Sequence, residues 1–517
     1  MPVFGPDLAG PASLHTLLAD AVRIAPGAFA LADGRRRWTW RDVSDQVDRL
    51  AAYFVARGLQ PGDRVASLLP NCGELVLFYF ACLKAGVIAT PLNHRYTPAN
   101  IDYALEFSDA QMLMVRAERA ADIAASQQAG ALSKGLISVG GGLDAAKALE
   151  TVLSADVPEV TFPEIDIDAT ALIFFTSGST GRPKGVMHSI RSFGSITASF
   201  AQAMKVTETD VVFPGGSVSH VGSFSTVLAA FSRRAPVVLE RGFDADSVLR
   251  LIRQHKPTVI VALPAALIAF LHDHKATRED FRSVRLLISG GDKFPVEVER
   301  QFVELAGLPI TETYGLTEAT DCTLGPVDGS AKPGSVGQFC PGYQGSIRDK
   351  EGREVSEGAL WLSGAPVCQG YWNNPEENAK CFRDGWFDTG DVMRIDEDGF
   401  LWFKGRSKQI IIHDGSNIAP QEVEEAVMLH PAIDLAGAVG VRNALHGENV
   451  WVFVTLKPNV PRPETQAIID TAKSQIGYKG PEMAIVLNEM PINATGKVDR
   501  MALKRLAAEK LAAGNGE

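Results

Sequence analysis

Cysteine is scarce and scattered in this sequence of 517 residues. The six cysteines include no C-x-x-C pair, which argues against a disulfide framework or a zinc site, so we interpret them as reduced structural thiols. Positive charge is not in excess either: 50 Lys and Arg against 61 Asp and Glu give a net charge of −11. General affinity for nucleic acid or an anionic membrane is therefore not expected.

Long apolar runs are also lacking. The longest, residues 75–92, is interrupted by Lys84, Gly86 and Pro91, and it fits a buried helix followed by a strand better than a membrane span. The first residues contain no basic segment followed by an apolar stretch, so we expect no signal peptide and a cytoplasmic location. Hydrophobic residues make up 46% of the chain, and this length predicts at least two globular domains.

Apolar segments of strand length alternate with segments of helix length along most of the chain. RVASLLP precedes ELVLFYFACLKAG, and TVIVALP precedes AALIAFLHDH. This alternation predicts an α/β fold with parallel-rich sheets covered by helices, whose ligands bind at the carboxyl ends of strands. The alanine-rich segment AADIAASQQAGALSKG is predicted to form a surface helix. We place a domain boundary between a large domain over residues 1–406 and a small α+β domain over residues 407–517.

A segment rich in glycine and hydroxyl groups, TSGSTGRPKG at positions 176–185, follows directly after the apolar segment ALIFF. Glycines let the backbone turn its N–H groups toward an anion, hydroxyls add donors, and Arg182 and Lys184 add positive charge. The spacing is not that of a Walker A loop. A polar surface loop is the alternative, but the preceding strand favours a phosphate-binding loop. Its predicted binding residues are Thr176, Ser177, Gly178, Ser179, Thr180, Gly181 and Lys184.

Four further motifs follow the loop. They are SGGD at 289–292, YGLTE at 314–318, WFDTGD at 386–391 and PINATGKVDR at 491–500. Taken alone, the last three have a structural explanation: Thr317 could cap a helix, Asp391 could belong to a turn, and Lys497 could be a solvated surface lysine. The ordered set, however, resembles the adenylate-forming superfamily of acyl-CoA synthetases, peptide-synthetase adenylation domains and luciferases. The loop matches that family's TSGSTGxPKG motif at every defined position, and the resemblance covers nearly the whole chain.

The resemblance implies a role for each motif in binding ATP. Glu318 would bind Mg²⁺, a hard cation that prefers oxygen ligands, while Thr317 would contact the α-phosphate and the acyl carboxylate. Tyr314 would stack on adenine, and Asp391 and Arg406 would reach the ribose. Lys497 would be the catalytic lysine, because its ammonium can stabilise the charge that develops during adenylation. The other implied nucleotide-binding residues are Gly291, Asp292, Thr313 and Gly315.

The same resemblance implies an acyl pocket and a moving domain. His220 would lie beside the substrate carboxylate and later near the thiol, and Gly222, Gly290 and Thr313 would line the pocket. Ser219 replaces the usual aromatic residue, and Thr313 stands where several long-chain and aryl-acid enzymes have glycine. Because threonine would narrow the channel, we expect a short-to-medium or modest aromatic acid. The small domain would rotate about Lys408 and bring Gly415 to a thiol tunnel, although Asp414 replaces a second glycine there.

The predicted function is an ATP-dependent carboxylic acid–CoA ligase, with ATP, Mg²⁺ and coenzyme A as its ligands. It would form an acyl-adenylate and then a thioester, releasing pyrophosphate and AMP. Alternatives are a ligase that loads the phosphopantetheine of a carrier protein, a luciferase-type oxidation, or a non-catalytic nucleotide sensor. The sensor is disfavoured because a pure binder has no need of Lys497. The sequence leaves the acid, the pathway and the oligomeric state, including a homodimer, open.

Overall fold

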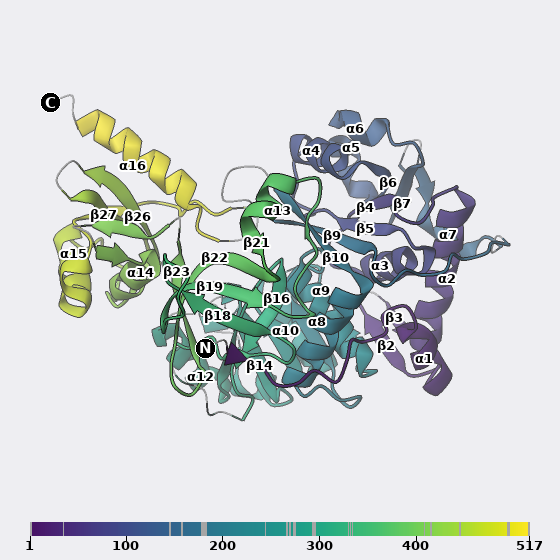
Figure 1. Ribbon diagram of the computed structural model, residues 1–517, viewed down its shortest axis with the longest axis horizontal. Helices are drawn as coiled ribbons and strands as arrows, with labels where there is room; N and C mark the ends of the chain where they lie inside the picture. The colour runs from purple at the N-terminus through teal and green to yellow at the C-terminus, as the bar shows by residue number, and fades with distance from the viewer. Residues whose placement is uncertain are drawn as a thin grey trace.

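The computed structural model describes residues 3–34, 36–143, 146–156, 159–176, 183–242, 244–264, 267, 270–271, 276–291, 296–328, 330, 332, 334–407, 409–413, 416–443, 446–493 and 497–514. Figure 1 shows a large body built on three sheets and a small C-terminal domain at one end.

The first sheet has nine strands in the order β17-β16-β15-β14-β13-β11-β12-β2-β3. Strand β2 and strands β11 to β15 run parallel, so their carboxyl ends share one edge. The strands are β2 (Phe29–Ala32), β3 (Arg37–Thr39), β11 (Val212–Gly215), β12 (Val237–Val238), β13 (Val259–Ala262), β14 (Leu286–Gly290), β15 (Ile310–Leu316), β16 (Ala319–Leu324) and β17 (Gln338–Phe339). Its accompanying helices are α9 (Val221–Ser232), α10 (Ala245–His255) and α12 (Val296–Ala306).

The second sheet has eight strands in the order β20-β10-β9-β5-β4-β6-β7-β8. The strands are β4 (Arg64–Leu68), β5 (Ile88–Pro91), β6 (Ala110–Arg116), β7 (Gly135–Val139), β8 (Ala146–Ala148), β9 (Thr170–Thr176), β10 (Lys184–Ser189) and β20 (Gly370–Tyr371). The helices of this part are α1 (Leu17–Ile24), α2 (Trp40–Ala56), α3 (Gly73–Ala85), α4 (Pro98–Ser108), α5 (Ala120–Ala125), α6 (Gln127–Gly130), α7 (Leu149–Ser154) and α8 (Ile190–Ala203). Helix α8 packs on α9 and α2 packs on α3.

The third sheet of the large body joins β1 (Val3–Phe4), β18 (Gln344–Arg348), β19 (Glu357–Ser363), β22 (Trp386–Ile395), β21 (Phe382–Arg383) and β23 (Leu401–Arg406), with α13 (Pro375–Cys381) nearby. The small domain has its own sheet and core. It contains β24 (Ile411–His413), β25 (Ser416–Ile418), β26 (Ile433–Asn443), β27 (Gly447–Leu456), β28 (Met483–Val486), α14 (Pro420–Met428), α15 (Thr465–Ile476) and α16 (Arg500–Gly514).

The predicted α/β class, with a large N-terminal and a smaller C-terminal domain, is confirmed. The apolar run 75–92 forms the buried helix α3 and then β5, and the helix ends at Gly86, whose φ of +71° suits a residue without a Cβ. All six cysteines are free thiols. Within the described residues, no helix is both long and apolar enough to cross a membrane.

The alanine-rich segment does not form the single helix that we predicted. It divides into α5 and α6 because Ser126 between them takes an extended backbone conformation. The Ser126 side chain accepts a hydrogen bond from Ala129 N and donates one to the Asp102 carboxylate. A serine that caps a new helix in this way competes with helix continuation, which overrides the high helix propensity of the alanines.

Candidate functional site

The turn that carries Thr317 and Glu318 joins β15 to β16 in the nine-stranded sheet. The strand register shifts at this point, and Gly315 is required because a Cβ there would overlap the backbone of Asp321. Two groups from outside the sheet hold the turn. His188 Nε2 lies 2.9 Å from Thr317 O, and Cys368 N donates to Glu318 O at 2.8 Å.

Glu318 is buried, with only 8% of the residue exposed. The Tyr371 hydroxyl donates to its Oε1 atom at 2.7 Å. Burial raises the pKa of Glu318, while the Tyr371 hydrogen bond and the positive charges of Arg406 and Lys184 oppose that rise. Lys184 itself forms an ion pair with Glu377, and its ammonium lies 4.8 Å from the centre of the Tyr371 ring.

This surrounding fits an Mg²⁺ ion that arrives with ATP. In the described part of the chain, no three or more acidic, His or Cys side chains gather in a way that could hold a metal. One protein carboxylate is consistent with Mg²⁺, which usually keeps several waters and takes its other oxygen ligands from phosphates. Glu318 would be that carboxylate.

Asp391, on β22, is buried and faces the end of β23. Its Oδ2 atom accepts a hydrogen bond of 2.6 Å from the Tyr314 hydroxyl, and its Oδ1 atom lies 3.1 Å from Arg406 Nε. That contact lacks hydrogen-bond geometry, so Oδ1 is buried without a hydrogen-bond partner among the described residues. Burial raises the pKa of Asp391, and the Arg406 charge opposes the rise. An unsatisfied buried acceptor of this kind fits a ligand hydroxyl, such as one of a ribose.

His220 and Lys497 lie close enough for the charge of Lys497 to affect the pKa of His220, although 277 positions separate them in the sequence. His220 precedes the first residue of α9. Burial lowers the pKa of His220 to about 4, and nearby His94, Lys497 and Arg95 add to the effect. The Lys497 charge also acts on the pKa of Asp391. The backbone of Lys497 is fixed by Asn493, whose side chain accepts from Lys497 N and whose N–H donates to Lys497 O.

Gly290 and Thr313 are paired neighbours on β14 and β15. The Thr313 hydroxyl donates to Thr323 O at 2.6 Å. This bond fixes the side chain so that its methyl group occupies the space where a Cβ of residue 290 would lie. Glycine at position 290 is therefore a packing requirement created by Thr313.

The first turn of α9 packs against β16 through a buried acid that sequence reasoning missed. Asp321 is 9% exposed, and its Oδ2 atom lies 2.7 Å from Ser225 Oγ. The Ser225 hydroxyl also lies 2.7 Å from Gly222 O, so Gly222 belongs to this junction. Burial raises the pKa of Asp321 to about 6, although hydrogen bonds from Ser225 and Thr320 oppose the rise.

His188 and Tyr371 were also missed, because neither lies in a recognised motif. One signal was present for His188: on β10 it alternates with Lys184 and Val186, so all three share a face of the strand. Of the predicted nucleotide-binding residues, Thr176 ends β9 opposite Lys184, and Gly291 has φ +85°. The predicted positions 177–182, Asp292, Lys408 and Gly415 lie outside the described residues.

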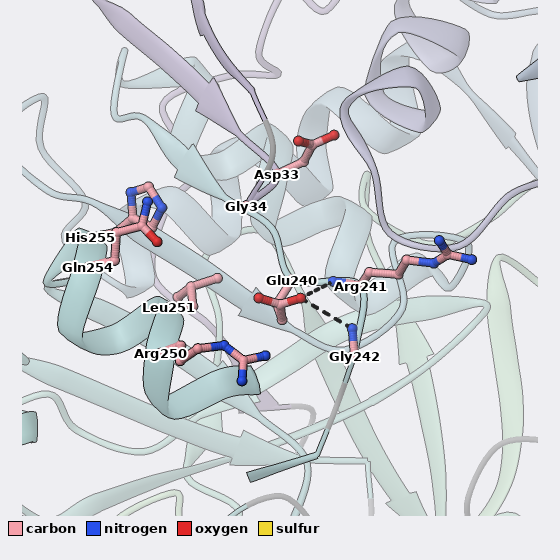
Figure 2. Close-up of a pocket in the computed structure, with 9 residues that line it drawn as sticks. All are labelled: Asp33, Gly34, Glu240, Arg241, Gly242, Arg250, Leu251, Gln254 and His255. Atoms are coloured by element: carbon pink, nitrogen blue, oxygen red, sulfur yellow. Dashed lines mark hydrogen bonds between the residues drawn. The ribbon is translucent and has the colours of Figure 1, made fainter. Parts of the chain in front are cut away.

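A separate cavity of about 570 Å³ opens where β2 and β12 end, beside α10 (Figure 2). The Glu240 carboxylate lies in its centre and accepts hydrogen bonds from the backbone N–H groups of Arg241 and Gly242. The residues that line it are Asp33, Gly34, Glu240, Arg241, Gly242, Arg250, Leu251, Gln254 and His255. No predicted site residue is among them.

Comparisons with known proteins agree with the geometry. Residues 18–372 match the model of the AMP-binding enzyme family, and residues 422–497 match the AMP-binding enzyme C-terminal domain. The chain is 32% identical over 528 residues to a long-chain-fatty-acid–CoA ligase of Bacillus subtilis (strain 168), covering 95% of this chain and 94% of that protein. It is 31% identical over 497 residues to a feruloyl-CoA synthase of an Amycolatopsis species, covering 93% and 96%.

A solved structure of ATP-bound MatB from Rhodopseudomonas palustris is also similar. It superposes with a TM-score of 0.88 at 28% identity, covering 96% of this chain and 99% of MatB. The family match spans more than half of the chain, and the relatives match over nearly its whole length. The chain therefore belongs to the AMP-binding enzyme family, within the adenylate-forming superfamily that includes the acyl-CoA synthetases.

Proposed function

We propose that this chain is an ATP-dependent carboxylic acid–CoA ligase that works through an acyl-adenylate. The observation that carries the proposal is the convergence at one place of the Thr317–Glu318 turn, the Asp391–Arg406 pair, the start of α9 and Lys497. A nucleotide with its metal needs such a set: a carboxylate for the metal, an acceptor for the ribose, and cations for the phosphates.

In the first step, a carboxylate oxygen of the acid attacks the α-phosphorus of ATP, and the bond to pyrophosphate breaks. Glu318 would hold Mg²⁺, which would offset the charge of the phosphates. Lys497 stabilises the negative charge that grows on the α-phosphate and the attacking oxygen. Asp391 and Arg406 fix the ribose, and the 176–185 segment contacts the phosphates. Because the low pKa of His220 keeps its ring neutral near pH 7, His220 meets the acid as a hydrogen-bonding group.

In the second step, the thiol sulfur of coenzyme A attacks the acyl carbonyl carbon, the bond to AMP breaks, and the thiol proton leaves. We place the boundary of the moving domain at residues 406 and 407 and the hinge at Lys408. Strand β23 ends at Arg406 in the sheet of the large body, and the next strand, β24, belongs to the sheet of the small domain. Gly415 would line the thiol tunnel after rotation.

The acid is proposed to be short to medium in length or a modest aromatic acid. The support is Thr313, whose methyl group fills the space beside Gly290 and whose hydroxyl is tied to Thr323 O. A branched side chain held in this way would leave less room in the acyl pocket beside Gly290 than glycine would.

The test is pyrophosphate release from Mg-ATP with a panel of acids: acetate, hexanoate, octanoate, palmitate, benzoate and ferulate. Release that depends on the acid and continues to turn over with coenzyme A supports the ligase and ranks the substrate classes. Release that stalls with coenzyme A but continues with a phosphopantetheinylated carrier protein favours the carrier-loading alternative. Binding of ATP without release for any acid favours the nucleotide sensor. The cytoplasmic location and a homodimeric state stay proposals, which cell fractionation and light scattering would test.

A further inference from the structure

His188 is a polar side chain enclosed by aromatic rings. It lies on β10 with 0% exposure. The Phe193 ring on α8 meets it edge to face at a centroid distance of 5.3 Å, and the Phe174 ring on β9 does so at 6.4 Å. An apolar side chain would suit these surroundings better, because a buried polar group costs free energy unless it is hydrogen-bonded.

One hydrogen bond accounts for the histidine. Its Nε2 atom lies 2.9 Å from Thr317 O. Because a carbonyl oxygen only accepts, Nε2 must carry the proton, and Nδ1 then has none. Nδ1 is buried without a hydrogen-bond partner in the described residues. Burial also lowers the pKa of His188 to about 4, so the ring is neutral near pH 7. Only one ring nitrogen is used, and it is used on the turn that carries Glu318.

The contact joins two different sheets. Thr317 and Glu318 belong to the nine-stranded sheet, whereas β10 lies in the eight-stranded sheet. Strand β10 pairs with β20, which carries Tyr371, and Val186 stands opposite Tyr371. This strand pair and the residues just before β20 therefore supply His188 to Thr317 O, Tyr371 to the Glu318 carboxylate, and Cys368 N to Glu318 O.

We propose that His188 is a positioning residue that holds the Thr317–Glu318 turn in place for Mg-ATP, acting through the Thr317 carbonyl. The inference rests on the proposed function of Thr317 and Glu318. Without the His188 bond, the turn keeps its two contacts at Glu318, from the Tyr371 hydroxyl and from Cys368 N. It loses the contact that β10 makes with Thr317 O. The turn then shifts relative to the phosphates, so use of Mg-ATP suffers. Partners that orient metal ligands commonly contribute tenfold to hundredfold effects.

Three variants separate positioning from simple packing. In His188→Gln the amide nitrogen reaches approximately the place of Nε2, and in His188→Asn it reaches only the place of Nδ1. His188→Leu removes the N–H donor and places an apolar side chain among the aromatic rings. We expect Asn and Leu to lower kcat for pyrophosphate release by about 10- to 100-fold and to raise the Mg²⁺ concentration for half-maximal rate. Gln should recover most of both.

The measurements are steady-state kinetics with the best acid of the panel and calorimetric binding of Mg-ATP to each variant. Rescue by Gln but not by Asn supports the proposal. Equal kinetics and Mg-ATP binding in Asn, Leu and wild type would overturn it, as would equal losses in Gln, Asn and Leu, which would indicate a packing role. Failure of the proposed function is a different result: wild type would then release no pyrophosphate with any acid. The calorimetric comparison of the variants would still decide the inference in that case.

Discussion

Replacement of the buried acid Asp321 by asparagine should make the protein more stable, and more so at high pH. The carboxyl lies under the first turn of α9 with a pKa raised from 3.8 to about 6. Because the folded pKa exceeds the unfolded one, ionisation is harder in the folded state. The free energy of unfolding therefore falls as pH rises from about 4 to about 6 and is level above that range. A shift of roughly two units costs about 3 kcal/mol once the carboxyl is fully ionised.

Asparagine removes this cost while keeping the contact between residue 321 and Ser225. Its amide can donate to Ser225 Oγ, and the Ser225 hydroxyl then remains available to Gly222 O. We expect Asp321→Asn to gain about 3 kcal/mol at pH 8 and about half of that at pH 5. The gain is about 3 to 4 °C in Tm at pH 8 if a unit of roughly 400 residues unfolds together.

The assay is thermal unfolding of both proteins at pH 5 and pH 8 with one scan rate, because a chain of this size need not unfold reversibly. Asp384→Asn is the matched control. Asp384 is exposed and has φ +51°, close to the +48° of Asp321, so it reports the effect of asparagine in a left-handed backbone conformation. If Asp321→Asn gains no more at pH 8 than at pH 5, or no more than the control, the reasoning about the buried charge is refuted.

Three further predictions concern the reaction. Lys497→Ala should lower acid-dependent pyrophosphate release by about 10²- to 10³-fold but should still convert a supplied acyl-adenylate to the thioester; equal losses in the two half-reactions would contradict its assignment to adenylation. Tyr371→Phe removes a hydrogen bond that lowers the pKa of Glu318. The acid limb of kcat/KM for Mg-ATP should therefore move to higher pH, and an unchanged limb would count against that role. Thr313→Gly should admit longer acids, with about fourfold in kcat/KM for each CH₂ that becomes buried; an unchanged profile across a chain-length series would disprove the narrowing by Thr313.

The sequence was informative where a structural signal is local. The run 75–92 gave α3 and β5 because its apolar residues and its glycine lie within one continuous segment. The motifs at Tyr314, Glu318, Asp391 and Lys497 could be recognised in the sequence because each consists of a few neighbouring residues. The structure joins two of them, through the hydrogen bond from the Tyr314 hydroxyl to Asp391.

What could not be predicted depends on contacts between distant positions. His188 meets Thr317 across 129 positions, and Ser225 meets Asp321 across 96. Periodicity and motif spacing report on neighbours along the chain and say nothing of such pairs. Ser126 shows a smaller limit of the same kind, because its bond to Asp102 comes from another helix and helps to end α5.

The end of β23 has a practical consequence for ligand screening on a truncated form of the protein. The last residue of the strand, Arg406, lies opposite Asp391, and the next N–H, of Ser407, donates to Gly390 O at 2.9 Å. The N–H groups of Gln409 and Ile410 then donate back to Arg406 O. A large-domain fragment cut after residue 406 would lose all three bonds, and its terminal arginine would fray. Screens on that fragment would underestimate the affinity of nucleotide-like inhibitors. A fragment that extends through residue 410 would keep the three hydrogen bonds.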